Sequence, residues 1–185
     1  HGGQVFNNMA SIDATGNSGN DGVALVANAH TTTSGASTAS GFDNLITSSF
    51  SATALAAARI QMVGFRGDQG ERISIMPSLI IHPPDIYDLV YEVTESEGNP
   101  DNASNAANVH EGKYKTEEWN YLTDVNNWAL VDETLMKDAL TWFERIPYEF
   151  LMVEDFDRLI GKWRLYGRYG HGYNDWRWIL GAVVS

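Results

Sequence analysis

The residues best suited to chemistry in this sequence are five histidines, which can bind metals or move protons. No two of them lie at the i, i+2 or i, i+4 spacing that would bring both onto one face of a strand or helix. The sequence therefore predicts no histidine metal centre. We expect His82, beside Pro83, to end a strand, and His171, between two glycines, to lie in a turn. The five histidines are His1, His30, His82, His110 and His171.

Motifs for a nucleophile or a phosphate-binding loop are also missing. The strings nearest to G-x-S-x-G are Gly16–Gly19 and Gly35–Ser37, and neither fits that pattern. Residues 64–70 carry glycines at the wrong spacing for a dinucleotide fingerprint and predict a helix-to-strand turn, which includes the tripeptide Arg66-Gly67-Asp68. The chain has no cysteine, so disulfides, thiolate metal sites and a cysteine nucleophile are excluded. We expect no catalytic, cofactor-binding or metal-binding residue and no enzymatic activity.

Neighbouring carboxylates are the feature closest to a glycosidase site, in which an acid and a base flank the sugar. They occur at 117–118, 132–133 and 154–157, in the same region as Trp119 and Trp128, whose rings can stack on sugars. Adjacent strand residues point to opposite faces, so we interpret these acids as solvated surface charges and the tryptophans as core. A carbohydrate-binding or glycosidase β-rich domain stays open as an alternative from a different class.

The elements that would position these side chains form an α+β pattern. Residues 1–50 are rich in Gly, Ser, Thr and Asn and predict loops and short strands. Ser51 can cap an alanine-rich helix over 52–63, and Asp85 can cap a second, amphipathic helix. A long polar loop follows over 96–110. Strands are expected over 72–82 with a break at Pro77, and over 113–119, 128–131, 143–153 and 162–184, with a short helix over 135–140.

Charge is distributed unevenly along the 185 residues, which carry 24 acidic and 12 basic side chains and a net charge of −12. Residues 158–185 hold five basic residues and one acid, a charge of +4, and residues 1–157 hold the remaining −16. An acidic body argues against general affinity for nucleic acid or anionic membranes, and no stretch is apolar enough to cross a membrane.

The late segment 162–178 is crowded with Trp, Tyr and Arg, which are enriched at protein interfaces. A basic end and an acidic body are complementary, so we interpret them as surfaces for self-assembly. A twisted strand pair with an aromatic core face is the alternative interpretation.

A series of short strings then follows in an order that resembles a known family. The first is Asp21–His30, of the form D-G-x-x-L-x-x-x-x-H, and the last is N-D-W-R-W-I-L-G at 174–181. Over about residues 20–182, the series resembles the second part of the major capsid proteins of tailed bacteriophages, particularly the Mu-like major head subunit type. Between the two ends lie Asp43-Asn44-Leu45, the alanine-rich helix ending at Met62, Asp68-Gln69-Gly70, the string P-S-L-I-I-H-P-P at 77–84, and L-T-D-V-N-N-W-A-L at 122–130.

This resemblance implies a Hong Kong 97-type capsid fold. A loop-rich N-terminal remainder would occupy 1–50, and a peripheral domain with a spine helix at Ser51–Phe65 would occupy 51–83. An axial domain would follow over 84–157, with the polar loop near a symmetry axis. Return strands over 158–185 would rejoin the two domains. The family also has an N-terminal arm and an extended hairpin before the matched stretch, which lace subunits together, and we expect both to be largely absent here.

The function implied by the resemblance is structural. The subunit would form pentamers and hexamers of an icosahedral shell around double-stranded DNA, held without sequence specificity. Scaffold, portal or decoration proteins would be further partners, and no cofactor or membrane would take part. Its location would be the virion, after assembly in the bacterial host cytoplasm. An encapsulin-like compartment shell, which shares the fold, is the alternative within the same class.

Overall fold

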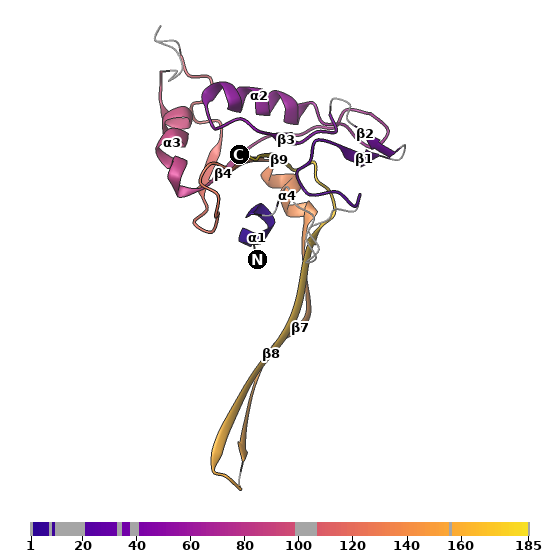
Figure 1. Ribbon diagram of the computed structural model, residues 1–185, viewed down its shortest axis with the longest axis vertical. Coiled ribbons are helices and arrows are strands. Elements are labelled where there is room, and N and C mark those ends of the chain that lie inside the picture. Colours follow the sequence, from indigo (N-terminus) through magenta and orange to yellow (C-terminus); the bar gives the residue numbers. More distant parts are fainter. Residues whose placement is uncertain are drawn as a thin grey trace.

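The centre of the molecule is a mixed five-stranded sheet. The computed structural model describes residues 2–7, 9, 21–32, 35–37, 41–98, 107–155 and 157–184. The sheet is formed by β3 (Leu45–Ile46), β4 (Leu79–His82), β5 (Lys115–Glu118), β6 (Trp128–Val131) and β9 (Ile179–Ala182). The strand order is β3-β9-β6-β4-β5 (Figure 1). β6 pairs antiparallel with both β9 and β4, whereas β3 joins β9 and β5 joins β4 in parallel.

Burial along the strands follows their position in the sheet. The central strands β6 and β9 are buried at every residue, as expected for apolar strands that are covered on both faces. β5, at one edge, is exposed at every residue and carries Lys115, Glu117 and Glu118. Charged side chains on an edge strand oppose its pairing with other strands.

Two helices predicted from the sequence are confirmed. α2 (Ala52–Val63) begins after Ser51, whose hydroxyl accepts a hydrogen bond of 3.1 Å from the backbone N–H of Ala54. α3 (Tyr87–Glu95) follows the short 3-10 turn η1 (Pro84–Ile86). The predicted cap is wrong, because Asp85 lies within η1 and no side chain in the described part of the chain caps α3. Both helices bury apolar side chains on the face turned toward the body. These are Leu55, Ala58 and Met62 from α2, and Val90 and Val93 from α3.

Two further helices, α1 (Gly2–Asn7) and α4 (Glu133–Ala139), lie across the sheet from α2 (Figure 1). The carboxylate of Asp132 caps α4 by accepting from the N–H groups of Thr134 and Leu135. In β9, a Cβ added at Gly181 would lie 2.7 Å from Val26. Glycine is therefore required where the segment before β1 packs on the sheet.

The most prominent feature is a long β-hairpin that leaves the body (Figure 1). β7 (Leu140–Asp155) continues directly from α4, and β8 (Ile160–Tyr173) returns antiparallel to it. The pairing runs from Leu140–Tyr173 at the base to Asp155–Ile160 at the tip, with two register shifts between Glu144 and Glu149. Pro147 lies within the shifted stretch, and proline cannot donate to a strand ladder. A second, small hairpin joins β1 (His30–Thr32) to β2 (Gly35–Ser37).

Several predicted elements differ from those observed. Residues 72–78 are not a strand, because the N–H of Met76 donates to the Asp132 carboxylate at 2.8 Å instead of to a neighbouring strand. The long strand expected over 162–184 is two strands, separated by a turn over 174–178. His171 lies in β8 opposite Trp142 and not in a turn. A helix, α1, forms in the part where only loops and short strands were expected.

The five-stranded sheet draws on residues 45–182. It includes β4 from the stretch assigned to a peripheral domain (51–83) and β5 and β6 from the stretch assigned to an axial domain (84–157). The division of the chain into those two domains, with return strands over 158–185, stays a prediction. His1 and the string Gly16–Gly19 lie outside the described residues, as does most of the polar loop.

Candidate functional site

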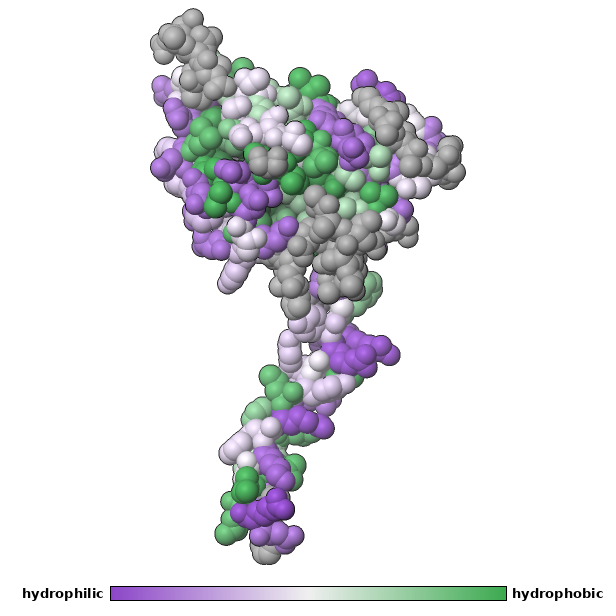
Figure 2. Space-filling model, in the orientation of Figure 1, coloured by the Kyte–Doolittle hydropathy of each residue, from purple (hydrophilic) through white to green (hydrophobic). Residues whose placement is uncertain are grey.

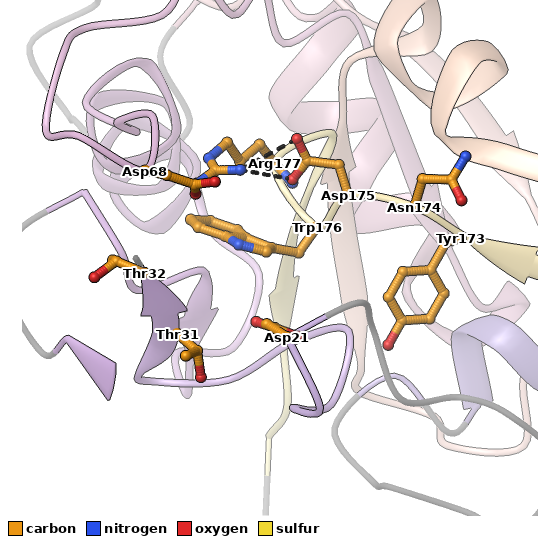
Figure 3. A pocket seen from close by; sticks show the side chains of 9 residues that line it. All are labelled: Asp21, Thr31, Thr32, Asp68, Tyr173, Asn174, Asp175, Trp176 and Arg177. Atoms are coloured by element: carbon orange, nitrogen blue, oxygen red, sulfur yellow. Dashed lines mark hydrogen bonds and ion pairs between the residues drawn. The ribbon is translucent and has the colours of Figure 1, made fainter. Parts of the chain in front are cut away.

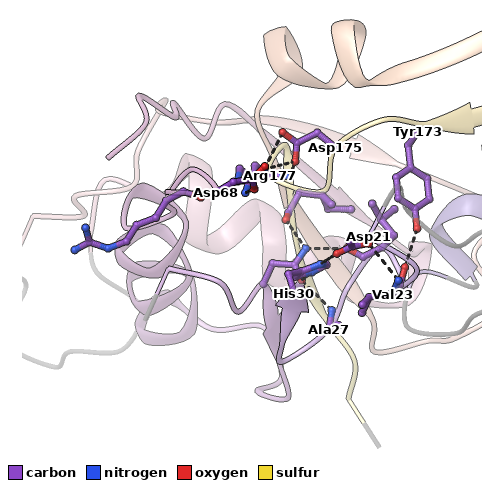
Figure 4. Close-up of polar contacts among 12 residues, drawn as sticks. Asp21, Val23, Ala27, His30, Asp68, Tyr173, Asp175 and Arg177 are labelled. Carbon is purple, nitrogen blue, oxygen red and sulfur yellow. Dashed lines mark hydrogen bonds and ion pairs between the residues drawn. The ribbon is translucent and has the colours of Figure 1, made fainter. Parts of the chain in front are cut away.

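Three of the strings that form the family-like series meet at the base of the hairpin. His30 is fully buried, with Nδ1 2.8 Å from a carboxylate oxygen of Asp21 and Nε2 2.9 Å from Oδ1 of Asn44 (Figure 4). The Asn44 amide donates to the carbonyls of Leu25 and Ile179, which fixes its oxygen toward His30. Both ring nitrogens therefore lie within hydrogen-bond distance of side-chain oxygens, which hold the ring in place.

Trp176 and Arg177 complete this cluster. The ring of Trp176 stacks on His30, with centroids 4.0 Å apart and 7° between planes, and meets Phe65 edge to face. The Arg177 guanidinium lies 4.8 Å from the Trp176 ring centroid. We call Asp21, His30, Asn44, Asp68, Trp176 and Arg177 the motif cluster.

Arg177 binds the turn that follows α2. Its Nε donates to the carbonyl of Arg66 at 2.7 Å, and its terminal nitrogens pair with Asp68 and Asp175. The tripeptide Arg66-Gly67-Asp68 forms the predicted turn, with the N–H of Gly67 bonded to the carbonyl of Glu71. Its role in the fold is to receive Arg177.

A hollow of about 350 Å³ opens beside the motif cluster (Figure 3). Three carboxylates line it, but Asp21 pairs with His30, and both Asp68 and Asp175 pair with Arg177. These pairs give the carboxylates a structural role. Within the described part of the chain, no three His, Asp or Glu side chains are gathered as metal ligands.

The carboxylates and tryptophans considered for a glycosidase lie in different settings. Asp132 is buried as the cap of α4, which corrects its interpretation as a solvated acid. Glu133 pairs with Lys115 and Lys137, whose hydrogen bonds lower the pKa of Glu133 to about 2. Trp128 is 1 % exposed, so its ring cannot stack on a sugar. Trp119 is half-buried and packs on Phe6.

The end of the polar loop holds a second buried histidine. Asn108 donates to the carbonyls of Val93 and Ser96 at the end of α3, and its own oxygen accepts from the backbone N–H of His110. Burial lowers the pKa of His110, and the charges of Lys113 and Arg59 act in the same direction, against a hydrogen bond with the backbone of Ala52. Asn108 therefore fastens the end of the loop to α3, and the His110 ring contacts the start of α2. His82 is also buried and ends β4, as predicted.

The surface most exposed to a partner is the outer half of the hairpin (Figure 2). Cross-strand partners in an antiparallel pair share a face, and the pairs Phe150–Leu165 and Met152–Trp163 lie two residues apart. These four side chains therefore form one apolar face, and each is between 61 and 67 % exposed. We call them the apolar quartet. Charged and apolar side chains alternate along the ribbon, and the body covers none of its outer half (Figure 2).

The opposite face of the outer hairpin is basic and aliphatic. Leu151 pairs with Arg164 and Val153 with Lys162, and all four are exposed. Both register shifts insert residues into β7, so β8 keeps a regular alternation from end to end. Its even-numbered residues therefore share one side. We call Lys162, Arg164, Tyr166 and Arg168 the basic face of β8.

Sequence reasoning predicted strands here but not their exposure. An apolar run such as 150–153 is typical of a strand buried on both faces, and nothing in the run distinguishes burial within one chain from burial between chains. The crowding of Trp, Tyr and Arg was the one signal of an interface. The motif cluster was missed because its members come from segments more than a hundred residues apart.

Comparison with known families identifies the chain. No curated protein matches it. The model of a family described as "Phage capsid protein" matches residues 4–182, which is nearly the whole chain and includes the motif cluster and the hairpin. No helix in the described part of the chain is long and apolar enough to span a membrane. The chain belongs to this family of phage capsid proteins.

Proposed function

We propose that the chain is a subunit of an icosahedral phage head, assembled through pentamers and hexamers around double-stranded DNA. Membership of a capsid family implies a structural protein of the virion that self-assembles into a shell. We also propose that the subunit has a Hong Kong 97-type fold related to that of the Mu-like head subunit, with α2 as its spine helix. The ordered strings and the mixed α+β architecture support this proposal.

The observation that carries the proposal is the exposed hairpin. A two-stranded ribbon alone in water is marginally stable, and the apolar quartet adds a solvent-exposed hydrophobic face. A neighbouring subunit that covered this face would stabilise the ribbon and the contact together. Because the chain is a capsid protein, we assign the cover to a second copy of the same chain.

The observed hairpin lies within the matched stretch, between α4 and β9. Its position in the chain differs from that of the extended hairpin that the resemblance places before the matched stretch. We propose that β7 and β8 serve as a contact arm of this subunit.

Charge supports enclosure of DNA without general adhesion to it. Residues 140–173 contain five basic and five acidic side chains, so the whole net charge of −12 belongs to the rest of the chain. A strongly acidic body repels phosphate, which keeps packaged DNA from adhering to the inner wall. Scaffold, portal and decoration proteins remain proposed partners, and assembly in the host cytoplasm remains a proposed setting.

Electron microscopy of the full-length gene product tests the proposal. We expect closed shells, or pentamers and hexamers, and DNA that is protected from nuclease in particles recovered from infected cells. A protein that stays monomeric at every concentration would overturn the proposal. Shells that enclose a cargo enzyme in place of DNA would identify an encapsulin-like compartment. Specific binding to a glycan array would instead support the carbohydrate-binding alternative.

A further inference from the structure

We propose that the basic face of β8 in one copy docks on an acidic face of α3 in a second copy. This inference rests on the proposed self-assembly and names the two surfaces that form one of its contacts. The partner in this contact is a neighbouring subunit of the same protein.

Cations outnumber acids on the basic face. β8 contributes Lys162, Arg164 and Arg168 and no acidic residue, and Glu149 of β7, the partner of Tyr166, is an acid on the same side of the ribbon. Lys162 and Arg168 are six residue steps apart, a distance of about 20 Å at the rise of a β-strand. The exposed aliphatic side chains of Leu151 and Val153 lie on the same side of the ribbon. The surface therefore combines cations with apolar contact area.

The outer side of α3 has the opposite charge. Asp85, at the start of the helical segment, is followed by Asp88, Glu92 and Glu95, and all four are exposed. Steps of three and four residues place them along one side of a helix, away from the buried Val90 and Val93. No basic residue occurs between 85 and 95. We call these four carboxylates the acidic face of α3.

The two faces match in length and in chemistry. From Asp85 to Glu95 the helical segment rises about 15 Å, close to the span of the cations on β8. Tyr91 and Leu89 flank the carboxylates and are 59 and 38 % exposed, so the helix also offers apolar contact area. Cations opposite carboxylates would fix the register of the contact, while the apolar side chains supply burial.

A hairpin cannot reach the α3 of its own chain. The ribbon leaves the body on the side away from α3 and points outward along its whole length (Figure 1). The contact must therefore join two copies, and it uses a different surface on each. Such a heterologous contact repeats from copy to copy and closes into rings when the rotation allows, as a shell requires.

Reciprocal charge reversal tests this contact in the full-length gene product. One variant reverses β8 (Arg164→Glu with Arg168→Glu) and the other reverses α3 (Asp88→Lys with Glu92→Lys). In each variant alone, like charges face each other across the contact. We therefore expect self-association, measured by sedimentation velocity, to weaken at least about tenfold. Mixing the two variants again places acids opposite cations, and we expect the mixture to recover assembly that neither variant shows alone.

The matched control reverses two exposed acids elsewhere, Glu117→Lys with Glu118→Lys on β5, and should assemble like the wild type. Circular dichroism should show that every variant is folded, since all the changed residues are exposed. If the wild type assembles but the two variants do so equally well, or if mixing them restores nothing, the contact is wrong while the proposed function stands.

A wild type that never assembles overturns the proposed function itself. If reversal of β8 abolishes retention of duplex DNA while leaving assembly intact, the basic face is a DNA contact and the inference is again overturned.

Discussion

At the residue scale, the fold depends on a few buried polar and aromatic side chains that join distant segments. Trp176 contacts both the ring of His30 and the guanidinium of Arg177, and Arg177 in turn binds the turn at Arg66 and Asp68. Removing this cluster would separate the start of the chain, the turn after α2 and the end of the hairpin. Its residues therefore stabilise the folded subunit, and assembly depends on them because only a folded subunit can assemble.

The chain offers a matched pair of Trp-Arg dipeptides with which to test this role. Trp176→Ala with Arg177→Ala removes buried contacts, and we expect a loss of about 3–5 kcal/mol in the free energy of unfolding. Trp163→Ala with Arg164→Ala removes the same side chains from the exposed hairpin, and we expect a change within about 0.5 kcal/mol. Urea denaturation measures both. Equal losses in the two variants would contradict the assignment of these residues to core and surface.

Asp21 should matter for a different reason. Asp21→Asn replaces the carboxylate that lies 2.8 Å from Nδ1 of the buried His30 ring, and so disturbs this hydrogen bond. A buried polar group that loses its partner typically costs about 1–3 kcal/mol, and we expect a loss of that order in thermal or urea unfolding. Asp138→Asn, on the exposed side of α4, is the control and should be neutral. A neutral Asp21→Asn variant would show that the pair is not needed for stability.

His110 makes stability depend on pH. Because burial lowers its pKa from the ordinary value of 6.5, the unfolded chain takes up a proton at higher pH than the folded chain does. The contribution of neutral His110 is complete above pH 6.5 and declines as the pH falls below 6.5 toward the lowered pKa. We expect His110→Asn to reduce this acid loss, measured as the difference in unfolding free energy between pH 7.5 and 5.5. An identical pH dependence in wild type and variant would contradict the prediction.

At the element scale, the sequence predicted most helices and strands but not which of them leave the body. Ser51 before an alanine-rich run and Asp132 before residues 133–139 are local capping signals, and both helices begin where these signals lie. The length of β7 was underestimated because it runs past the apolar stretch into polar residues, whereas the predicted strand over 162–184 was too long because β8 ends at Tyr173. Whether a strand pair packs on the body or projects from it depends on which surfaces of the body are already covered. A local sequence pattern does not contain that information.

Shortening the hairpin should separate folding from assembly. Ile146 and Arg168 are backbone partners, so residues 147–167 can be replaced by an Asn-Gly turn that joins them. The removed residues whose burial the structure describes are all exposed or half-buried, and we expect the free energy of unfolding of the body to change by less than about 1 kcal/mol. Light scattering should show that self-association is lost. Association equal to that of the intact chain would contradict the role of the hairpin.

Leu159 supplies the control for that experiment. It lies near the tip with a positive φ of 51°, which strains a side chain other than glycine. Leu159→Gly relieves the strain while keeping the ribbon and both of its faces. We expect this variant to associate like the wild type. A loss of association on this change alone would show that the tip of the hairpin, and not its two faces, makes the contact between subunits.

At the scale of the whole molecule, the charges are distributed differently from the acidic body and basic end that the sequence suggested. The sequence suggested an acidic body of −16 and a basic end of +4. The structure places most of the basic end on β8, whereas Arg177 is bound within the body. The hairpin as a whole carries equal numbers of acids and bases, and three of its five cations lie on one face of β8. Such a face can select one partner surface without attracting every anion.

The central claim is that neighbouring copies cover the exposed hairpin, and a cryo-electron microscopy map of the assembled particle tests it most directly. The account predicts density from a second copy against the apolar quartet of Phe150, Met152, Trp163 and Leu165. An assembled particle in which these four side chains face solvent, with subunits joined only through their bodies, would contradict it.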